Sequence, residues 1–427
     1  MKPFQAIRYN LNRVKIEEVV TPPYDVISPS EQQHFYEKSP YNMIRLDLSR
    51  PESGDTDQNN RYTRAAADFR KWIGEGVLIR DEKPSFYLYE QAFKIDGKSF
   101  MRRGLFGLRR LESFGSGKIY PHEKTIAGPK ADRLLLMKGC GANFSSIFGI
   151  YSDEKGEIRN LLAPLYEKKP LMELEQDGVG QKLWVVSEPE TVRMISSLLE
   201  AKPVVIADGH HRYETALTYR DWRLSQDPHA LDGAPFRYVL MYLASRDKAV
   251  VQPTHRVLRD IPKWNRRRLE ARLEQIATVQ VLSEKELFAK LAKAHPDACR
   301  FGIGYPGGEF RLVEIQAGDI EKIRALEEVP PLLRAFDVAV VHKIILEDLC
   351  GLSKTDETDP RFVEFVKSRE AGLKALTHQE TQCVLFMTPP DLGHMEKVVH
   401  SGLTMPPKTT YFYPKLLTGL VINSLDD

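Results

Sequence analysis

The sequence lacks the features that mark membrane-spanning and secreted proteins. No apolar run in its 427 residues approaches the roughly 18 residues that a membrane span needs. The first residues, MKPFQAIRYN, contain no apolar stretch of the kind found in signal peptides. The cysteines are few and far apart, and no two form a C-x-x-C pair: Cys140, Cys299, Cys350 and Cys383. We therefore expect a cytoplasmic protein with neither a zinc ribbon nor a disulfide framework.

An excess of charge of either sign is also missing. The 61 basic residues nearly balance the 59 acidic ones, and the net charge is +2. Proteins that bind nucleic acids or membrane surfaces carry a basic excess, so the composition argues against both partners and leaves only a local basic patch open. The hydrophobic content of 42% and the charged content of 28% are typical of a globular protein. A chain of this length is expected to form two or three domains.

The strings that identify the common nucleotide-binding folds do not occur. The sequence holds neither the Walker A pattern G-x-x-x-x-G-K-[ST] nor the H-R-D set of protein kinases. A phosphate site in this chain would therefore have to be built in another way.

The most informative stretch is VVIADGHHRYETAL, at residues 204–217. Val204–Ala207 is a short apolar run typical of a buried strand, and Asp208-Gly209 then ends it. From His210 onward the apolar residues recur at helical spacing, so Asp208, Gly209, His210, His211 and Arg212 lie at a strand-to-helix turn. Backbone N–H groups at a helix start attract anions, and a glycine lets a ligand approach closely. The pattern predicts an anion-binding turn.

A purely structural interpretation of this turn is also open. Asp208 could act only as the N-cap of the helix, and Arg212 could pair with Glu214 or with another surface carboxylate. The concentration of five polar or flexible residues directly after a buried strand favours the functional interpretation.

Other polar residues are further candidates. Tyr24 and Asp25 lie in a stiff loop between two prolines and a helix that Ser28 or Ser30 begins. The run His122–Thr125 places an imidazole, a carboxylate, an ammonium and a hydroxyl in four consecutive residues. Three more residues are secondary anion-site candidates: His255, Arg256 and Lys408. Structural alternatives are a turn aspartate, a solvated loop, and a packed tail with an exposed lysine.

The remaining pattern mixes helices with strands. We expect a strand at 42–48 and a helix at 61–75 with Ala65, Ala66, Phe69 and Trp72 inward. Asp96-Gly97 and Gly307-Gly308 predict two hairpins. A domain boundary is expected near Ile261–Trp264, which gives domains of residues 1–260 and 261–427.

The chain resembles a known family along nearly its whole length. TPPYDVIS, KIYPHEKT, DRLLLMKGCGANFSSIF, DGVGQKLWVV, IADGHHRYETAL and MPPKTTYFYPKL follow one another as in domain-of-unknown-function family 1015. The string DGHHR also resembles the phosphate-binding motif of the ParB/sulfiredoxin-like superfamily, and most of all that of free-serine kinases of the SerK type. This resemblance implies an α+β fold. Residues 1–260 would form a mixed-sheet ParB/sulfiredoxin-like core with a large insertion at about 50–180, followed by a C-terminal α+β domain.

The same resemblance implies a phosphotransferase that acts on a small hydroxylated metabolite, with free L-serine the first candidate, or the reverse reaction from phosphoserine to serine. ATP or ADP would be the donor, with Mg²⁺ held by Asp208, and Tyr24 and Asn143 would bind the substrate. Asp208, His210 and His211 would be catalytic, with Asp25 or Glu123 as the base. The nucleotide-binding and phosphate-binding set would be Gly209, His211, Arg212, His122, Lys124, Thr125, Arg133, His255, Arg256 and Lys408.

Two other functions remain open. A metal-dependent phosphohydrolase could use Asp208, His210, His211 and His122 as ligands, although neighbouring helical side chains point about 100° apart. A non-catalytic nucleotide-binding switch is the second alternative, and the near-zero net charge argues against a nucleic-acid partner for it. Whether the chain forms a homodimer is open as well.

Overall fold

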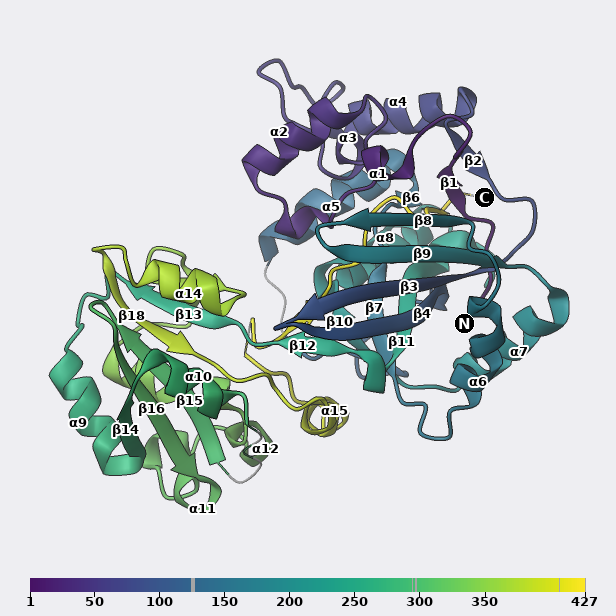
Figure 1. Cartoon of the computed structure of the whole chain (residues 1–427). Helices are drawn as coiled ribbons and strands as arrows, with labels where there is room; N and C mark the ends of the chain where they lie inside the picture. Colours follow the sequence, from purple (N-terminus) through teal and green to yellow (C-terminus); the bar gives the residue numbers. More distant parts are fainter. Residues whose placement is uncertain (124–126, 294, 296–297, 407, 427) are drawn as a thin grey trace. The chain divides into compact units, whose positions relative to one another are not determined.

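The computed structural model describes residues 1–123, 127–293, 295, 298–406 and 408–426. Its mixture of helices and strands confirms the predicted α+β class. The chain divides into two compact units. Unit 1 comprises Met1–Pro121, Thr125–Ala249 and Pro414–Asp427, and unit 2 comprises His122–Lys124 and Val250–Tyr413. This division differs from the expected domains 1–260 and 261–427, because β12 (Val250–Gln252) and β13 (His255–Arg259) belong to unit 2 and the C-terminal segment belongs to unit 1 (Figure 1).

Unit 1 is built, within its described residues, on an eight-stranded mixed sheet. The strand β10 runs parallel to β5 and antiparallel to β7, and β7 runs parallel to β11. The other neighbouring pairs are antiparallel. In sheet order the strands are β5 (Ile119–Tyr120), β10 (Val204–Asp208), β7 (Ile147–Tyr151), β11 (Tyr238–Ser245), β4 (Lys98–Arg110), β3 (Phe86–Ile95), β9 (Val179–Val186) and β8 (Met172–Gln176).

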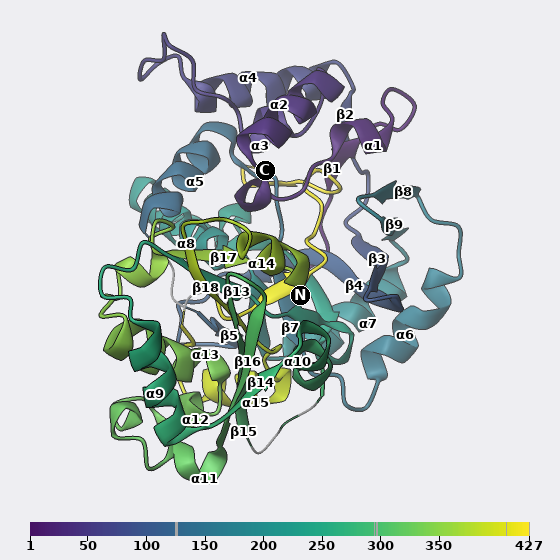
Figure 2. The same cartoon turned by 60° about the vertical axis from the view of Figure 1, so that its left-hand side comes forward.

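The helices of unit 1 surround this sheet, and α8 packs on β7 and on α5, which in turn contacts α4 (Figure 2). They are α1 (Ile16–Val19), α2 (Pro29–Lys38), α3 (Ile44–Asp47), α4 (Arg61–Gly74), α5 (Ala127–Cys140), α6 (Glu157–Tyr166), α7 (Pro189–Glu200) and α8 (His210–Gln226), with short 3-10 turns η1 (Tyr24–Val26), η2 (Pro235–Arg237) and η3 (Arg246–Lys248). The helix α8 forms where it does because its residues Tyr213, Ala216 and Tyr219 share one buried face, which joins the apolar core under β10.

Local sequence signals account for several of these elements. Asp96 and Gly97 both have positive φ, 49° and 75°, as a two-residue hairpin turn requires, and the predicted hairpin of β3 and β4 is confirmed. The helix predicted at 61–75 is α4, and its four predicted inward residues are buried. Ser28 caps α2 in a capping box with Glu31.

The predicted strand at 42–48 is wrong, because this segment contains the short helix α3 instead. Met43, Ile44 and Leu46 are all buried, although a strand would place Met43 and Ile44 on opposite faces. Burial on consecutive positions is typical of a short helical turn enclosed on all sides. A short apolar run cannot distinguish the two structures by periodicity alone.

The C-terminal segment returns to unit 1, where its backbone pairs with three other segments of that unit. The strand β20 (Asn423–Ser424) pairs with β6 (Ala142–Asn143), and β1 (Ile7–Tyr9) pairs with β2 (Leu78–Arg80). The backbone of Ile422 bonds to that of Ile7, and Thr418 bonds to Thr21. This course of the chain brings Lys415 into the same unit as β10.

Unit 2 has a six-stranded antiparallel sheet among its described residues. In sheet order its strands are β14 (Thr278–Leu282), β16 (Glu309–Gln316), β15 (Ala298–Tyr305), β18 (Thr381–Phe386), β13 (His255–Arg259) and β17 (Val363–Val366). The hairpin predicted at Gly307-Gly308 joins β15 to β16. A separate two-stranded ladder pairs β12 (Val250–Gln252) with β19 (Tyr411–Tyr413).

The helices of unit 2 pack on this sheet around apolar clusters on both of its faces. They are α9 (Arg266–Ile276), α10 (Glu284–Leu291), α11 (Ala317–Ile320), α12 (Pro331–Arg334), α13 (Asp337–Val340), the π-helix η5 (Val341–Leu349), α14 (Arg369–Ala375) and α15 (Leu392–His400), with 3-10 turns η4 (Arg324–Leu326) and η6 (Asp356–Thr358). Across the described part of the chain, none of the helices is both long enough and apolar enough to span a membrane.

Candidate functional site

The DGHHR turn, residues Asp208–Arg212, joins the end of β10 to the start of α8. Gly209 is the N-cap residue of α8, with φ 91° and ψ 31°, in the left-handed region that favours glycine. A Cβ at this position would lie 3.0 Å from the Arg212 guanidinium. The strand-to-helix turn predicted from the sequence is therefore present, and its glycine is required by the backbone.

Asp208 binds two cations, and the N-cap residue of α8 is Gly209. Its Oδ2 accepts a hydrogen bond from Arg212 Nη2 at 2.7 Å, and its Oδ1 accepts one from Lys415 Nζ. The N-cap of α8 carries no side-chain cap hydrogen bond. Glu214, the other suggested partner of Arg212, pairs with Lys130 instead. The structural alternative in which Asp208 is only a cap is thus not what the structure shows.

This three-residue network of Asp208, Arg212 and Lys415 is largely buried, with side-chain exposures of 18%, 10% and 14%. Burial alone would raise the pKa of Asp208, but Lys415 and Arg212 outweigh it and hold that pKa well below its usual value. Arg212 also donates to the backbone carbonyl of Ser146. Because one carboxylate faces two cations, the network keeps one net positive charge at the start of α8.

Side chains of β3 and β4 bind the backbone at Pro414 and Lys415 and hold it in place. Gln91 Nε2 donates to the Lys415 carbonyl at 3.0 Å, and the buried Arg102 donates to the Pro414 carbonyl and to Gln91 Oε1. The Arg102 guanidinium lies 4.5 Å from the Phe148 ring. These contacts fix the chain so that the Lys415 ammonium reaches Asp208.

Asp208 does not fit the role of a Mg²⁺ ligand. Both of its carboxylate oxygens already bind cations, so a metal ion there would have to displace Arg212 or Lys415. Among the described residues, no group of three or more His, Cys, Asp or Glu side chains is placed to hold a metal.

Tyr24, Asp25 and Arg133 lie in the same unit as the turn. The Arg133 guanidinium lies 4.1 Å from the centre of the Tyr24 ring. Burial raises the pKa of Tyr24 to about 12, although Arg212 and Arg133 oppose that shift. Burial lowers the pKa of Arg212, but Asp208 and Asp25 outweigh it and raise that pKa. Tyr24 and Asp25 therefore lie within electrostatic reach of Arg212.

Two aspartates that the sequence analysis did not select hold Arg133. Its Nη1 donates to the carbonyl oxygen of Asp47 at 2.7 Å and to Asp47 Oδ1 at 3.1 Å, and its Nε donates to Asp132 Oδ2 at 2.8 Å. Burial raises the pKa of Asp47, an effect that Arg133 and Arg212 oppose. Arg133 is thus a buried residue whose guanidinium is held by two aspartates.

A small cavity of about 40 Å³ lies between these groups, lined by Asp47, Arg133, Arg212 and Thr215 among others. Asp47 Oδ2 and the neighbouring Ser146 Oγ are buried without a hydrogen-bond partner among the described residues. The volume and these polar atoms suit an ordered water molecule. A substrate would not fit in this cavity.

Asn143, which was predicted to bind the substrate, uses its side chain to join neighbouring strands. Its Oδ1 accepts hydrogen bonds from the Leu240 backbone N–H at 3.2 Å and from Asn423 Nδ2 at 3.1 Å. The side chain is buried and connects β6, β11 and β20.

The other predicted residues that the structure describes belong to unit 2. His122 Nε2 lies 2.7 Å from Thr410 Oγ1, and Glu123 Oε2 accepts from the Lys408 N–H at 3.3 Å. Arg256 Nη2 donates to the Lys408 carbonyl at 3.3 Å. Three motifs that are distant in sequence therefore meet in unit 2. Lys124 and Thr125 lie outside the described residues.

His255 and Arg256 are both buried. His255 Nδ1 accepts from the Met387 N–H at 3.1 Å, and burial lowers the pKa of His255 to about 4, which keeps the ring neutral. Burial also lowers the pKa of Arg256 to about 9, although Glu357 opposes the shift. Arg256 donates to the Thr254 and Lys408 carbonyls and also lies 3.5 Å from His342 Nε2, so its partners belong to unit 2.

Comparison with known proteins identifies the family. Residues 1–339 match the family described as "Protein of unknown function (DUF1015)", and the chain belongs to that family. No curated protein matches the sequence.

The solved structures that match the chain are remote from it in sequence. They include a C-terminally truncated SbnI from Staphylococcus aureus, at 12% identity and a TM-score of 0.37, covering 74% of this chain and 87% of that one. A free serine kinase in complex with AMP matches at 13% identity and a TM-score of 0.33, covering 74% and 92%. A conserved hypothetical protein from Pyrococcus furiosus matches at 12% identity and 0.34, covering 74% and 95%. TM-scores of this size leave the activity to be argued from the site.

Proposed function

We propose that the chain is a cytoplasmic, nucleotide-dependent phosphotransferase that acts on a small hydroxylated metabolite, with free L-serine the first acceptor to test. The observation that carries this proposal is the start of α8. There Gly209 caps the helix in the left-handed conformation without a side-chain cap, while Arg212 and Lys415 flank Asp208. Helix N–H groups together with a net positive charge form the kind of site that holds phosphate groups.

The proposed roles follow from this geometry. The N–H groups of the first turn of α8 and the His211 side chain would contact the donor phosphates, and Arg212 would offset their charge. Phosphoryl transfer depends on charge neutralisation and placement more than on covalent chemistry, so a fixed cationic turn suits it. Asp208 is a positioning residue here, because it holds Arg212 and Lys415 in place.

Asp25 is the better candidate for the base that accepts the proton of the substrate hydroxyl. It is exposed, it lies in the 3-10 turn η1 that precedes α2, and its charge acts on Arg212. The side chain of Glu123, the other candidate, already accepts a hydrogen bond from the Lys408 backbone N–H. A general base must lie within reach of both the substrate and the phosphate site. Asp25 is near enough to the phosphate site for its charge to act on Arg212.

A turnover assay tests the proposal. Purified protein with Mg²⁺ is incubated with ATP or ADP and L-serine, and the reverse reaction is started from phosphoserine. Phosphorus NMR then follows the phosphoserine and nucleotide signals. We expect serine-dependent phosphoryl transfer that falls about a hundredfold in His211→Ala. His229→Ala is the matched control, because His229 is an exposed histidine of the same unit outside the turn, and it should keep full activity.

The outcomes separate the alternatives. Nucleotide binding without transfer to serine or other hydroxylated acceptors would favour a non-catalytic switch. Neither binding nor transfer, or equal activity in both histidine variants, would contradict the proposed role of the turn.

A further inference from the structure

A second cavity of unit 1 lies away from the DGHHR turn. Its volume is about 420 Å³, within the usual range of small-molecule sites. Tyr151, at the end of β7, lines it, whereas Ser146, whose carbonyl binds Arg212, directly precedes β7. At about 3.3 Å per residue, this places Tyr151 about 16 Å from Ser146 along the strand. The two sites are therefore distinct.

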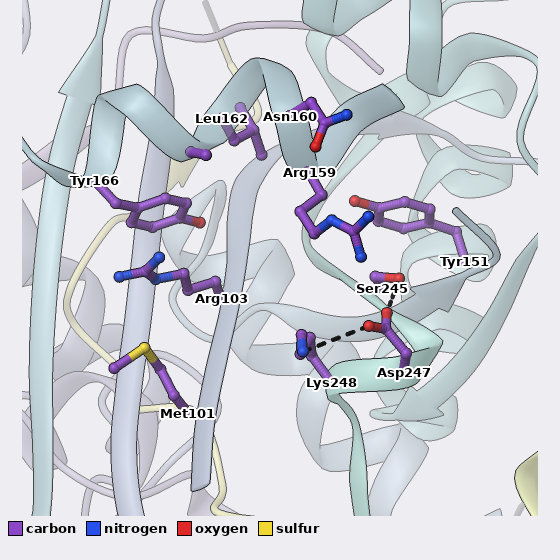
Figure 3. Close-up of a pocket in the computed structure, with 11 residues that line it drawn as sticks. Met101, Arg103, Tyr151, Arg159, Asn160, Leu162, Tyr166, Ser245, Asp247 and Lys248 are labelled. Carbon is purple, nitrogen blue, oxygen red and sulfur yellow. Dashed lines mark hydrogen bonds and ion pairs between the residues drawn. The ribbon is translucent and has the colours of Figure 1, made fainter. Parts of the chain in front are cut away.

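The walls of this cavity are apolar and aromatic. The buried rings of Tyr151 and Tyr166 face it, together with Leu162 of α6. Met101 of β4 is 47% exposed at its rim and provides a flexible apolar surface. In the view of Figure 3, the Tyr166 and Tyr151 rings lie on opposite sides of the Leu162, Asn160 and Arg159 side chains. Such a lining suits a flat apolar body, because aromatic rings stack on one another.

Three of the residues that line the cavity are cations: Arg103, Arg159 and Lys248. Arg159 of α6 lines it, and within the described part of the chain its guanidinium makes no hydrogen bond or ion pair. In Figure 3 this guanidinium extends toward Tyr151 and Ser245. Arg103 binds Glu90 through Nε at 2.6 Å and lies 4.6 Å from the Tyr166 ring centre.

The one carboxylate among the lining residues is already paired. Asp247 lies 3.6 Å from Lys248 Nζ and accepts a hydrogen bond from Ser245. Arg159 therefore faces an apolar cavity with no carboxylate of the described chain bound to it. A carboxylate ligand would pair with this guanidinium in a charge-assisted, bidentate arrangement.

We infer that this cavity is a second ligand site, which binds a small aromatic carboxylate with its carboxylate on Arg159 and its ring between Tyr151 and Tyr166. The inference does not depend on the proposed phosphotransferase activity. It rests on the cavity, on the aromatic walls and on an exposed cation that no carboxylate of the described residues binds.

The test is a fluorine NMR titration of the full chain with two matched probes, para-fluorophenylacetate and its neutral amide, para-fluorophenylacetamide. We expect saturable binding of the acid that is about tenfold or more tighter than that of the amide, as the loss of a charge-assisted contact implies. Arg159→Gln should remove this preference, and Ala163→Trp, which fills the cavity from α6, should abolish binding of both probes.

Arg193→Gln is the control, because Arg193 is an exposed helical arginine outside the cavity, and it should bind the acid as the unaltered chain does. Equal affinity for acid and amide, full binding in Arg159→Gln, or no binding of the acid would each overturn the inference. The melting temperature of each variant is measured alongside, so that loss of folding is recognised separately from loss of binding.

Discussion

The Asp208 network offers a quantitative test of how the DGHHR turn is stabilised. Asp208→Asn keeps the shape of the side chain but leaves Arg212 and Lys415 without their carboxylate, and these cations are only 10% and 14% exposed. Removing one partner from a buried ion pair costs about 3–5 kcal/mol of unfolding free energy. Lys415→Met leaves Asp208 with Arg212 and should cost about 1–3 kcal/mol. The double variant should fall short of additivity by at least about 0.5 kcal/mol, because the residues are in contact.

Urea unfolding followed by tryptophan fluorescence measures these changes. Three of the four tryptophans, Trp72, Trp184 and Trp222, belong to unit 1, so the signal reports mainly on the unit that contains the network. Asp232→Asn is the control, since Asp232 forms an exposed ion pair with Arg110 and should change the midpoint little. The reasoning is refuted if Asp208→Asn shifts the midpoint no more than this control does, or if the two network substitutions are additive.

The pH dependence gives a second readout of the same network. The folded-state pKa of Asp208 is depressed below the ordinary value of 3.8, so its ionised form stabilises the native state. This stabilisation is complete above the unfolded pKa and is lost as the pH falls through the folded one. The difference in stability between the unaltered chain and Asp208→Asn should therefore be constant at neutral pH and shrink below about pH 4. A difference that grows on acidification would contradict the assignment.

Three further predictions concern single residues. Gly209→Ala should cost about 1–3 kcal/mol of unfolding free energy, because φ is 91° there, and should weaken ADP binding in calorimetry. Asp25→Asn should lower kcat about a hundredfold while the ADP affinity stays unchanged; an unchanged kcat would remove Asp25 as the base. His255 has a folded pKa of about 4 against 6.5, so unit 2 should lose up to about 3 kcal/mol between pH 6.5 and 4. His255→Asn, which keeps an acceptor for the Met387 N–H, should lack this loss in urea titrations.

The parts of the structure that could be predicted from the sequence are those set by local chemistry. The β10–α8 junction follows from an apolar run, a glycine and a helical period within one short stretch. The Asp96-Gly97 hairpin follows from two residues that tolerate positive φ. The segment at 42–48 was predicted wrongly because its helix is too short to establish a period, and burial on all sides decides its structure.

The contacts that build the site depend on pairings that the sequence does not reveal. Lys415 reaches Asp208 across 207 residues, and Arg133 reaches Asp47 across 86. The motif YFYPKL contains Lys415, but Lys408 was predicted as the anion-site lysine because it stands beside two threonines. Only the return of the C-terminal segment to unit 1 distinguishes the two lysines, and that return is a property of the whole fold.

The central claim is that the start of α8 holds the phosphates of a nucleotide, and the backbone N–H signals of His210 and His211 test it most directly. The chain is labelled with ¹⁵N at histidine, the two signals are assigned with His210→Gln and His211→Gln, and ADP is titrated. We predict saturable shifts of both signals, with the His229 signal unchanged as an internal control. ADP binding that leaves the His210 and His211 signals in place would contradict the claim.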